Sequence, residues 1–293
     1  IGTKRNKGVY GMRIHGYHLK PAIQFKGSDD RNALVNDEDK YYLRKPLYLG
    51  FELEVECDNN YRNTVADALD LVSGVSGEDD FHLENDGSLR NGFEIVSQPR
   101  TLTSHQNFSV WQDVTTALSR MGCKSHDTRT CGLHIHFNRD CFGPRDEVKF
   151  MFWIYSQHNL LRAVTRRDPN NFCKTKSPHE CKKHKKTPRG DRYTAVNDTP
   201  RHTIEVRAFR GTLKHSTLMA CLEFVTASII FSNTVSPATL ADPTKSLKMF
   251  LGFLSGNGRV ATTYRHLIAL LKDKGYQIPE NRVRWKSESY INS

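Results

Sequence analysis

The stretch 48-YLGFELEVECD-58 decides how this chain can fold, because three glutamates alternate with apolar residues along it. Neighbouring side chains of a strand point to opposite faces, so Glu52, Glu54 and Glu56 share one face and the apolar residues between them share the other. Like charges on one strand face repel each other unless water or cations screen them. Two explanations therefore fit this segment alone: a solvated outer face of a sheet, or a row of oxygen ligands for Mg²⁺ or Mn²⁺.

The composition is that of a globular protein with one large domain or two modest ones. The chain has 293 residues, of which 37% are hydrophobic and 10% aromatic. The chain has no apolar run of about 18 residues, the length that would predict a transmembrane helix. We therefore expect no membrane partner. The start, 1-IGTKRNKGVYG-11, has no initiator Met and no apolar core of signal-peptide length, which fits a processed or trimmed product. Seven thinly spread cysteines indicate reduced thiols and a cytoplasmic protein.

The positive charge is concentrated in one segment. The chain carries a formal charge of +11, and residues 162–192 hold eleven Lys or Arg against three acids, which leaves only +3 for the rest. This segment is rich in proline and predicts a basic loop inserted into the fold. It is either a solvated loop or a site for an acidic partner or nucleic acid. The same loop offers a candidate Zn²⁺ site at 173–184, with ligands Cys173, His179, Cys181 and His184, although their spacing matches no standard zinc pattern.

The periodicity of apolar residues predicts a mixture of strands and helices. Strands are expected at 47–56, on both sides of a turn at 85–87 within 80–99, at 131–137 and at 203–210, and helices at 62–73, 103–121, 145–165, 214–232, 245–254 and 260–274. Residues 1–46 predict an irregular arm.

Three further strands also carry polar side chains on one face. His134 and His136 form an H-x-H pair on 131–137, Glu205 and Arg207 alternate with apolar residues on 203–209, and Glu94 lies between Phe93 and Ile95. Each pattern alone is explained by an exposed strand face or a surface ion pair. Taken together, they are the ingredients of a site in which several cations handle phosphate. The sequence contains no P-loop, no G-x-G-x-x-G after a strand and no G-x-S-x-G elbow.

Four motifs in this order resemble the amidoligase family, which is similar in fold to glutamine synthetase and glutamate–cysteine ligase. They are 50-GFELE-54, 86-DGSL-89 with 92-GFEIVSQP-99, 131-CGLHIHF-137 and 203-TIEVRAFRGTL-213, and 166-RRDPNNFCK-174 and 193-YTAVN-197 also fit. The fold class we expect is α+β: a curved, mainly antiparallel sheet with helices on its outer face, like the catalytic domain of glutamine synthetase. The domain division we expect is an N-terminal arm at 1–46, an amidoligase-like core at 47–232 with the basic insertion at 162–192, and a helical extension of the same domain at 233–293.

The resemblance also implies roles for individual residues. The implied metal ligands are Glu52, Glu54, Glu94, His134 and Glu205. His134, His136 and Arg207 are implied to bind the nucleotide. Arg207 would also act in catalysis by holding the transferred phosphoryl group, with help from Arg210, and Asp86 would lie next to the substrate and the metals.

The function implied is an ATP- and Mg²⁺-dependent (or Mn²⁺-dependent) ligase that joins a carboxylate to an amine through an acyl phosphate. The substrates stay open between small molecules and peptides. One alternative is a non-catalytic protein with the ligase fold that binds nucleic acid or another polyanion through the basic loop. A second alternative is a metal-dependent β-barrel enzyme, in which H-x-H and a glutamate hold one Fe²⁺ or Mn²⁺. The many predicted helices disfavour that barrel.

Overall fold

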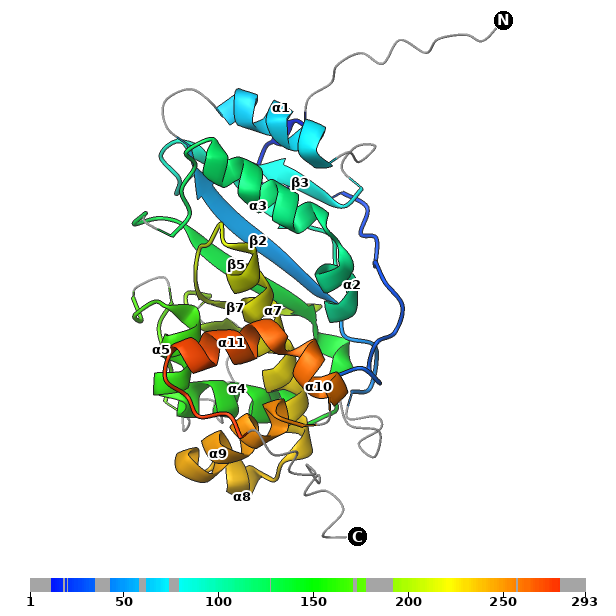
Figure 1. Ribbon diagram of the computed structural model, residues 1–293, viewed down its shortest axis with the longest axis vertical. Helices are drawn as coiled ribbons and strands as arrows, with labels where there is room; N and C mark the ends of the chain where they lie inside the picture. The colour runs from blue at the N-terminus through cyan, green and yellow to red at the C-terminus, as the bar shows by residue number, and fades with distance from the viewer. Residues whose placement is uncertain are drawn as a thin grey trace, which may run out of the picture.

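A computed structural model of the chain shows one seven-stranded sheet with helices packed against one of its faces (Figure 1). The structure describes residues 12–17, 19, 21–34, 43–57, 62–73, 79–126, 128–170, 173–177, 192–256 and 258–279. The sheet is open and mainly antiparallel, which confirms the predicted α+β class.

The strands follow the order β1-β3-β4-β2-β5-β7-β6 across the sheet. Their bounds are β1 Ile14–His15, β2 Leu49–Glu56, β3 Phe81–Glu84, β4 Gly92–Ser97, β5 Gly132–Asn138, β6 Val196–Asn197 and β7 Thr203–Arg210. All neighbouring pairs are antiparallel except β1 with β3. Strand β2, which carries Glu52, Glu54 and Glu56, therefore lies at the centre of the sheet.

The helices agree with the periodicity, but three predicted helices are interrupted. Their bounds are α1 Arg62–Ser73, α2 Leu102–Asn107, α3 Val110–Arg120, α4 Asp146–Ser156, α5 His158–Thr165, α7 His215–Thr234, α8 Pro237–Leu240, α9 Pro243–Leu254, α10 Gly258–Thr263 and α11 Arg265–Asp273, with a short 3₁₀ turn η1 at Arg139–Cys141. The single helices expected at 103–121, 145–165 and 260–274 are each two helices. At the second break the side chain of Gln157 donates to Pro243 O (3.0 Å) and Ser246 Oγ (2.9 Å). Such long-range contacts are invisible to periodicity.

The apolar face of the sheet packs under α3, α4 and α7, as aromatic contacts show. Trp111 of α3 lies 4.8 Å from the ring of Phe51, measured between centroids. Phe150 of α4 lies 5.3 Å from Phe137, and a ring on α7 packs against the end of β7 in the same way. Burial of these large rings supplies much of the stability of the fold. The predicted position of helices on the outer face of the sheet is confirmed.

Helix α7 is the centre of the helical layer. It is apolar and long enough to cross a membrane, but 89% of its apolar window is buried inside the protein. A helix that is apolar on all sides is typical of a core position. Its one carboxylate, Glu223, is fully buried and accepts hydrogen bonds from the ring of His266 (2.7 Å), Leu267 N (2.7 Å) and Gln106 Nε2 (2.8 Å). The cost of burying this charge is thus offset.

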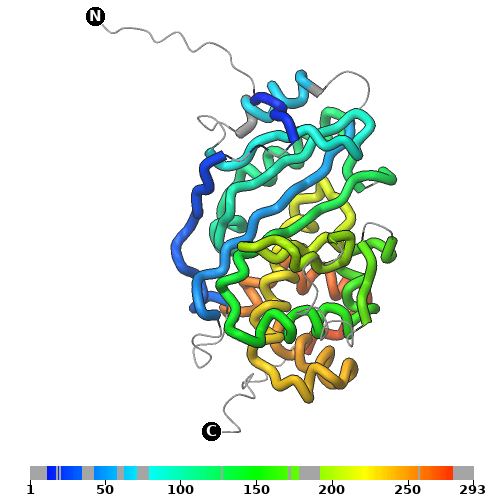
Figure 2. Tube along the Cα trace, turned by 180° about the vertical axis from the view of Figure 1, so that it is seen from behind, coloured from blue at the N-terminus to red at the C-terminus, as the bar shows by residue number. Residues whose placement is uncertain are grey.

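The N-terminal segment is less irregular than the sequence predicts. Within it, β1 adds an edge strand beside β3, and the backbone of Lys26 donates to Pro99 O at 2.9 Å. The amide side chain of Gln98 also accepts from Gln24 N at 3.0 Å. The blue segment in Figure 2 follows this edge of the sheet. Part of the predicted arm is therefore fixed to the core.

The basic segment 162–192 is described only in part. Its first four residues complete α5, within the helix predicted at 145–165, and 171–172 and 178–191 lie outside the described residues. Three of the four candidate zinc ligands, His179, Cys181 and His184, belong to that undescribed stretch. The fourth, Cys173, is buried, and burial raises the pKa of its thiol to about 11. The Zn²⁺ site stays a prediction.

Candidate active site

The strand register brings the predicted polar residues onto one face of the sheet. Glu52 of β2 lies opposite His134 of β5, and Glu54 lies opposite Glu94 of β4. His136 of β5 lies opposite Glu205 of β7. Figure 2 views the molecule from this side, with the central strands toward the reader. Residues from four separate motifs thus become direct neighbours, as the alternation predicts.

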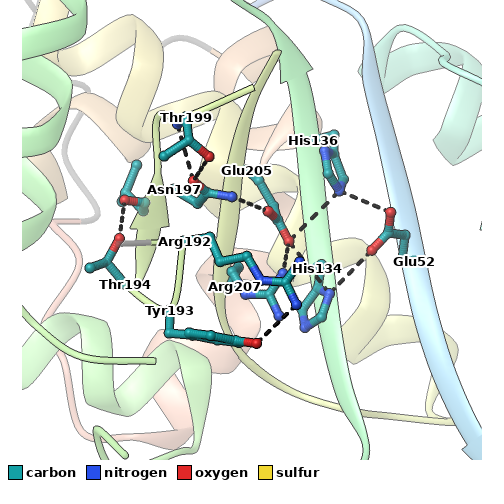
Figure 3. Close-up of polar contacts among 11 residues, drawn as sticks. Glu52, His134, His136, Arg192, Tyr193, Thr194, Asn197, Thr199, Glu205 and Arg207 are labelled. Atoms are coloured by element: carbon teal, nitrogen blue, oxygen red, sulfur yellow. Dashed lines mark hydrogen bonds and ion pairs between the residues drawn. The ribbon is translucent and has the colours of Figure 1, made fainter. Parts of the chain in front are cut away.

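The first group, the histidine cluster, consists of Glu52, His134, His136 and Glu205 (Figure 3). The two oxygens of Glu52 lie 3.2 Å from His134 Nδ1 and 3.2 Å from His136 Nε2. Glu205 Oε1 lies 3.6 Å from His134 Nδ1 and 3.9 Å from His136 Nε2. Two carboxylates therefore enclose two imidazoles.

Electrostatics within the histidine cluster are mutually favourable. Burial alone lowers the pKa of His136, but the carboxylates of Glu52 and Glu205 outweigh it and raise that pKa to about 9. Burial likewise raises the pKa of Glu52, yet the two imidazoles leave it well below its usual value. His136 Nε2 is buried and lacks a well-aligned hydrogen-bond acceptor among the described residues. His136 is therefore protonated at neutral pH, and its Nε2 lies within ion-pair distance of Glu52.

Arg207 and Asn197 hold Glu205 from the other side (Figure 3). Arg207 Nη1 donates to Glu205 Oε1, and Asn197 Nδ2 donates to Glu205 Oε2 at 2.7 Å. Asn197 in turn accepts from Thr199 Oγ1 at 2.7 Å. The Nε of Arg207 is buried and has no partner among the described residues. The sequence analysis did not select Asn197 as a site residue, although 193-YTAVN-197 marks its position.

The second group, the carboxylate cluster, consists of Glu54, Asp86 and Glu94. One oxygen of each lies within 4.8 Å of the others. Burial and the charges of Glu52, Glu54 and Asp86 raise the pKa of Glu94 to about 10. Burial also raises the pKa of Glu54, whose Oε2 accepts from Gly132 N. Without a cation, Glu94 therefore holds a proton at neutral pH.

The donor atoms of both clusters fit divalent cations. The groups Glu52–Glu94–His134, Glu52–His136–Glu205 and Glu54–Asp86–Glu94 each place one ligand atom per residue within 4.8 Å of the others. Carboxylate oxygens with few imidazoles suit Mg²⁺ and Mn²⁺. Because Glu52 and Glu94 each occur in two of these groups, the clusters are contiguous.

Two residues singled out in the sequence lie outside the clusters. Glu56, at the end of β2, accepts from Thr130 Oγ1 at 2.5 Å. Arg210 is exposed at the end of β7, opposite Gly132, and no described contact joins its guanidinium to either cluster. The role of Arg210 stays a prediction, and the geometry gives it no support.

An open cavity of about 460 Å³ adjoins the histidine cluster. Glu52, His136 and His82 line it on the sheet side, and the N-terminal segment contributes Ile23 and Phe25 to its wall. The ring of Phe25 lies 4.8 Å from that of Tyr48, edge to face. The cavity is largely apolar, and its charged lining comes from Glu52 and His136 of the histidine cluster and from the His82–Glu84 pair of β3. Sequence reasoning missed this cavity because its wall comes from a segment without periodicity.

Arg167 is a further residue that sequence reasoning missed. Its Nη1 lies 3.1 Å from the position that a Cβ on Gly132 would occupy, and Glu54 Oε2 and His134 Nε2 lie 3.4 Å from the same point. A side chain at 132 would crowd this guanidinium, so the glycine leaves it room beside the clusters.

Comparison with known families matches this part of the chain. Residues 49–190 match the family model described as "Putative amidoligase enzyme". Over these residues, which make up just under half of the chain, the sequence is similar to the amidoligase family. The matched region spans β2 to β5 and α5, and therefore includes every member of the two clusters except Glu205.

Comparison with solved structures finds a chain in the crystal structure of the complex between the prokaryotic ubiquitin-like protein Pup and its ligase PafA. The TM-score is 0.40 and the sequence identity 10%, and the match covers 80% of this chain. The same match spans 64% of the length of that chain. Comparison with curated proteins finds no match.

Proposed function

We propose that this protein is an ATP- and Mg²⁺-dependent carboxylate–amine ligase that works through an acyl phosphate. One observation carries the proposal: two contiguous groups of cation ligands, built from four strands, lie beside Arg207 on one sheet face. Phosphoryl transfer needs positioned cations and an arginine more than it needs a covalent catalyst.

The reaction has two steps. In the first, an oxygen of the substrate carboxylate attacks the γ-phosphorus of ATP, the bond to the bridging oxygen breaks, and ADP leaves with the electron pair. In the second, the amine nitrogen adds to the acyl carbon and loses a proton, and the carbon–oxygen bond to phosphate breaks. The products are an amide, ADP and inorganic phosphate.

The chain's own residues account for binding and orientation. The cavity beside the histidine cluster takes the apolar base of the nucleotide, and the part of it lined by Glu52 and His136 takes the phosphates. His136, protonated at neutral pH because its pKa is about 9, donates to a phosphate oxygen. Arg207, with a buried Nε that lacks a partner among the described residues, donates to the transferred phosphoryl group.

The cations would be held by Glu52, His134 and Glu205 on one side and by Glu54, Asp86 and Glu94 on the other. When bound, they neutralise charge on the phosphate oxygens. A cation would also replace the proton that Glu94 otherwise holds, which is the electrostatic reason for expecting one there.

The test is incubation with ATP, Mg²⁺ and pools of carboxylic acids and amines, scored by mass for products lighter by one water than the sum of an acid and an amine. Such a product, with equal ADP, is expected from the wild-type protein and not from Glu205→Gln. A control variant, Lys248→Gln, changes an exposed lysine on α9 and should behave as wild type. If no acid supports ADP formation, and nucleic-acid binding falls steeply with salt, the protein is a polyanion-binding relative instead.

A further inference from the structure

The opposite end of the polar face from the proposed nucleotide cavity carries an arginine that has no counter-ion among the described residues. Arg167 directly follows Arg166, the C-terminal cap of α5, and its guanidinium lies beside Gly132, Glu54 and His134. No ion pair joins it to a carboxylate among the described residues, although the carboxylate cluster is close by. An arginine with a free guanidinium fork beside a phosphoryl-transfer site is suited to bind an anion.

The backbone is specifically shaped to place this arginine. Arg166, at the C-terminal cap of α5, has φ 55° and ψ 27°, and it alone among the described non-glycine residues has a positive φ. This conformation is costly and persists where surrounding contacts hold it. Here Arg166 Nη2 donates to Arg210 O at 3.0 Å, which ties the turn to the end of β7. The turn sends the next side chain, Arg167, toward Gly132.

The direction of the reaction identifies which substrate this end receives. Strand β5 runs from Gly132, beside Arg167, to Asn138, which lines the nucleotide cavity. Six residues of strand separate them by about 20 Å. Since the attacking and leaving oxygens are roughly in line across the phosphorus, the carboxylate approaches from the side away from ADP. That side is the one where Arg167 lies.

The positive charge continues outward from Arg167. A surface depression of about 360 Å³ is lined by Arg162, Arg166, Arg167, Asp168 and Lys274, with Asn159 and Ala163. Its single carboxylate, Asp168, is already paired with Arg162 Nε at 2.7 Å. Lys274 follows α11, far along the chain, so two separate elements bring cations to the same depression.

We propose that the carboxylate substrate is a di- or oligocarboxylate: Arg167 binds the reacting end, and the outer depression binds a second negative group. This rests on the proposed function for the identity of the reacting end. The binding of an acidic ligand at Arg167 does not depend on turnover, and it can be measured without ATP.

The first experiment measures binding of a fluorescein-labelled hexaglutamate peptide by anisotropy at low salt, with hexaglutamine and a short oligothymidylate as comparison probes. Hexaglutamate should bind the wild-type protein. Arg167→Gln should weaken binding at least tenfold, Arg167→Lys less so, and Lys274→Gln about threefold, since an exposed charge contributes less than a positioned one. Arg120→Gln and Lys248→Gln, at exposed positions on α3 and α9, are matched controls and should bind as wild type.

Two outcomes would overturn the proposal: equal hexaglutamate binding by Arg167→Gln and wild type, or oligothymidylate binding with the same dependence on Arg167. The second experiment compares glutarate with butyrate as substrates for ATP-dependent condensation with hydroxylamine. Glutarate should show the lower KM, and Lys274→Gln should raise that KM with little change in kcat. Equal KM values for the two acids would contradict the proposal that the outer depression binds a second negative group. Absence of turnover with both acids, alongside Arg167-dependent hexaglutamate binding, would reject the ligase activity and leave the acidic site in place.

Discussion

The two clusters on the polar face share one sheet but solve the problem of buried charge differently. In the histidine cluster, Glu52 and Glu205 lie within 4 Å of imidazoles, and Glu205 is also held by Arg207 and Asn197. The carboxylate cluster contains acids alone, and the pKa of Glu94 rises to about 10. The first cluster is neutralised by the protein, whereas the second depends on a proton or a cation.

This difference separates structural from functional roles. A carboxylate that already has protein partners contributes to stability with or without a metal. A carboxylate without a charged partner of its own, such as Glu94, gains its favourable partner only when a cation binds. The carboxylate cluster is thus the part of the site for which a structural explanation is weakest.

The largest expected effect concerns the arginine attached to the histidine cluster. Arg207→Lys keeps the charge but loses the planar fork of donors. We expect the variant to fold, to bind ATP with Mg²⁺, and to form product about 10²–10³-fold more slowly, as for loss of one donor to a transition state. Steady-state kinetics with any productive substrate pair measure this. If the lysine variant turns over at the wild-type rate, Arg207 is only an ion-pair partner of Glu205 and has no catalytic role.

A matched pair of isosteric substitutions compares the clusters directly in the absence of metal. Glu205→Gln removes the partner of Arg207 and should lower the free energy of unfolding by about 2–3 kcal/mol. Glu94→Gln replaces a carboxyl that is already protonated at pH 7, so the change should be under about 0.5 kcal/mol. Urea denaturation at pH 7 with a chelator present measures both. Equal destabilisation by the two variants would mean that the clusters are not different in kind.

Metal binding should release a proton from the carboxylate cluster. Because the raised pKa keeps Glu94 protonated at neutral pH, a cation that binds its oxygen must displace that proton. Calorimetry of Mn²⁺ binding at pH 7.5, in buffers of different ionisation enthalpy, should give roughly one proton more for wild type than for Glu94→Gln. Affinity should rise with pH below about 10, since the ionised form is the one that binds. Binding of Mn²⁺ to the wild type with no proton release would contradict this.

The smallest expected effect concerns the amide that supports the histidine cluster. Asn197→Ala removes one hydrogen bond to Glu205, which keeps its contact with Arg207. We expect a loss of about 1 kcal/mol in stability and no change in the proton release assigned to Glu94. Thermal denaturation and the same calorimetric comparison test both points. A change in that proton release would show that the clusters are coupled through Glu205.

The alternation of side chains predicted most of the clusters. It placed Glu52, Glu94, His134 and Glu205 on polar strand faces, and the register then made them neighbours. It could not predict the β-bulge at which Arg207 and Ala208 both face His134. The bulge reverses the alternation, so that Phe209 lies opposite Leu133 on the apolar face and the exposed Arg210 lies opposite Gly132 with the parity of the polar face.

Other parts of the site depend on contacts between distant segments. Asn197 lies on a strand of only two residues, too short to show a period. The cavity wall at Ile23 and Phe25 comes from a segment held by backbone hydrogen bonds of Lys26 to residues 99 and 101 rather than by an apolar pattern. Arg167 reaches the clusters because of one left-handed residue before it and a glycine across from it. None of these features has a local signature in the sequence.

The central claim is that this sheet face binds divalent cations at both clusters, and anomalous diffraction from crystals grown with Mn²⁺ and a non-hydrolysable ATP analogue tests it most directly. The account predicts one Mn²⁺ peak among Glu52, His134 and Glu205 and another among Glu54, Asp86 and Glu94, with the analogue's phosphates between them. A map with the analogue in place and no Mn²⁺ peak at either cluster would contradict it.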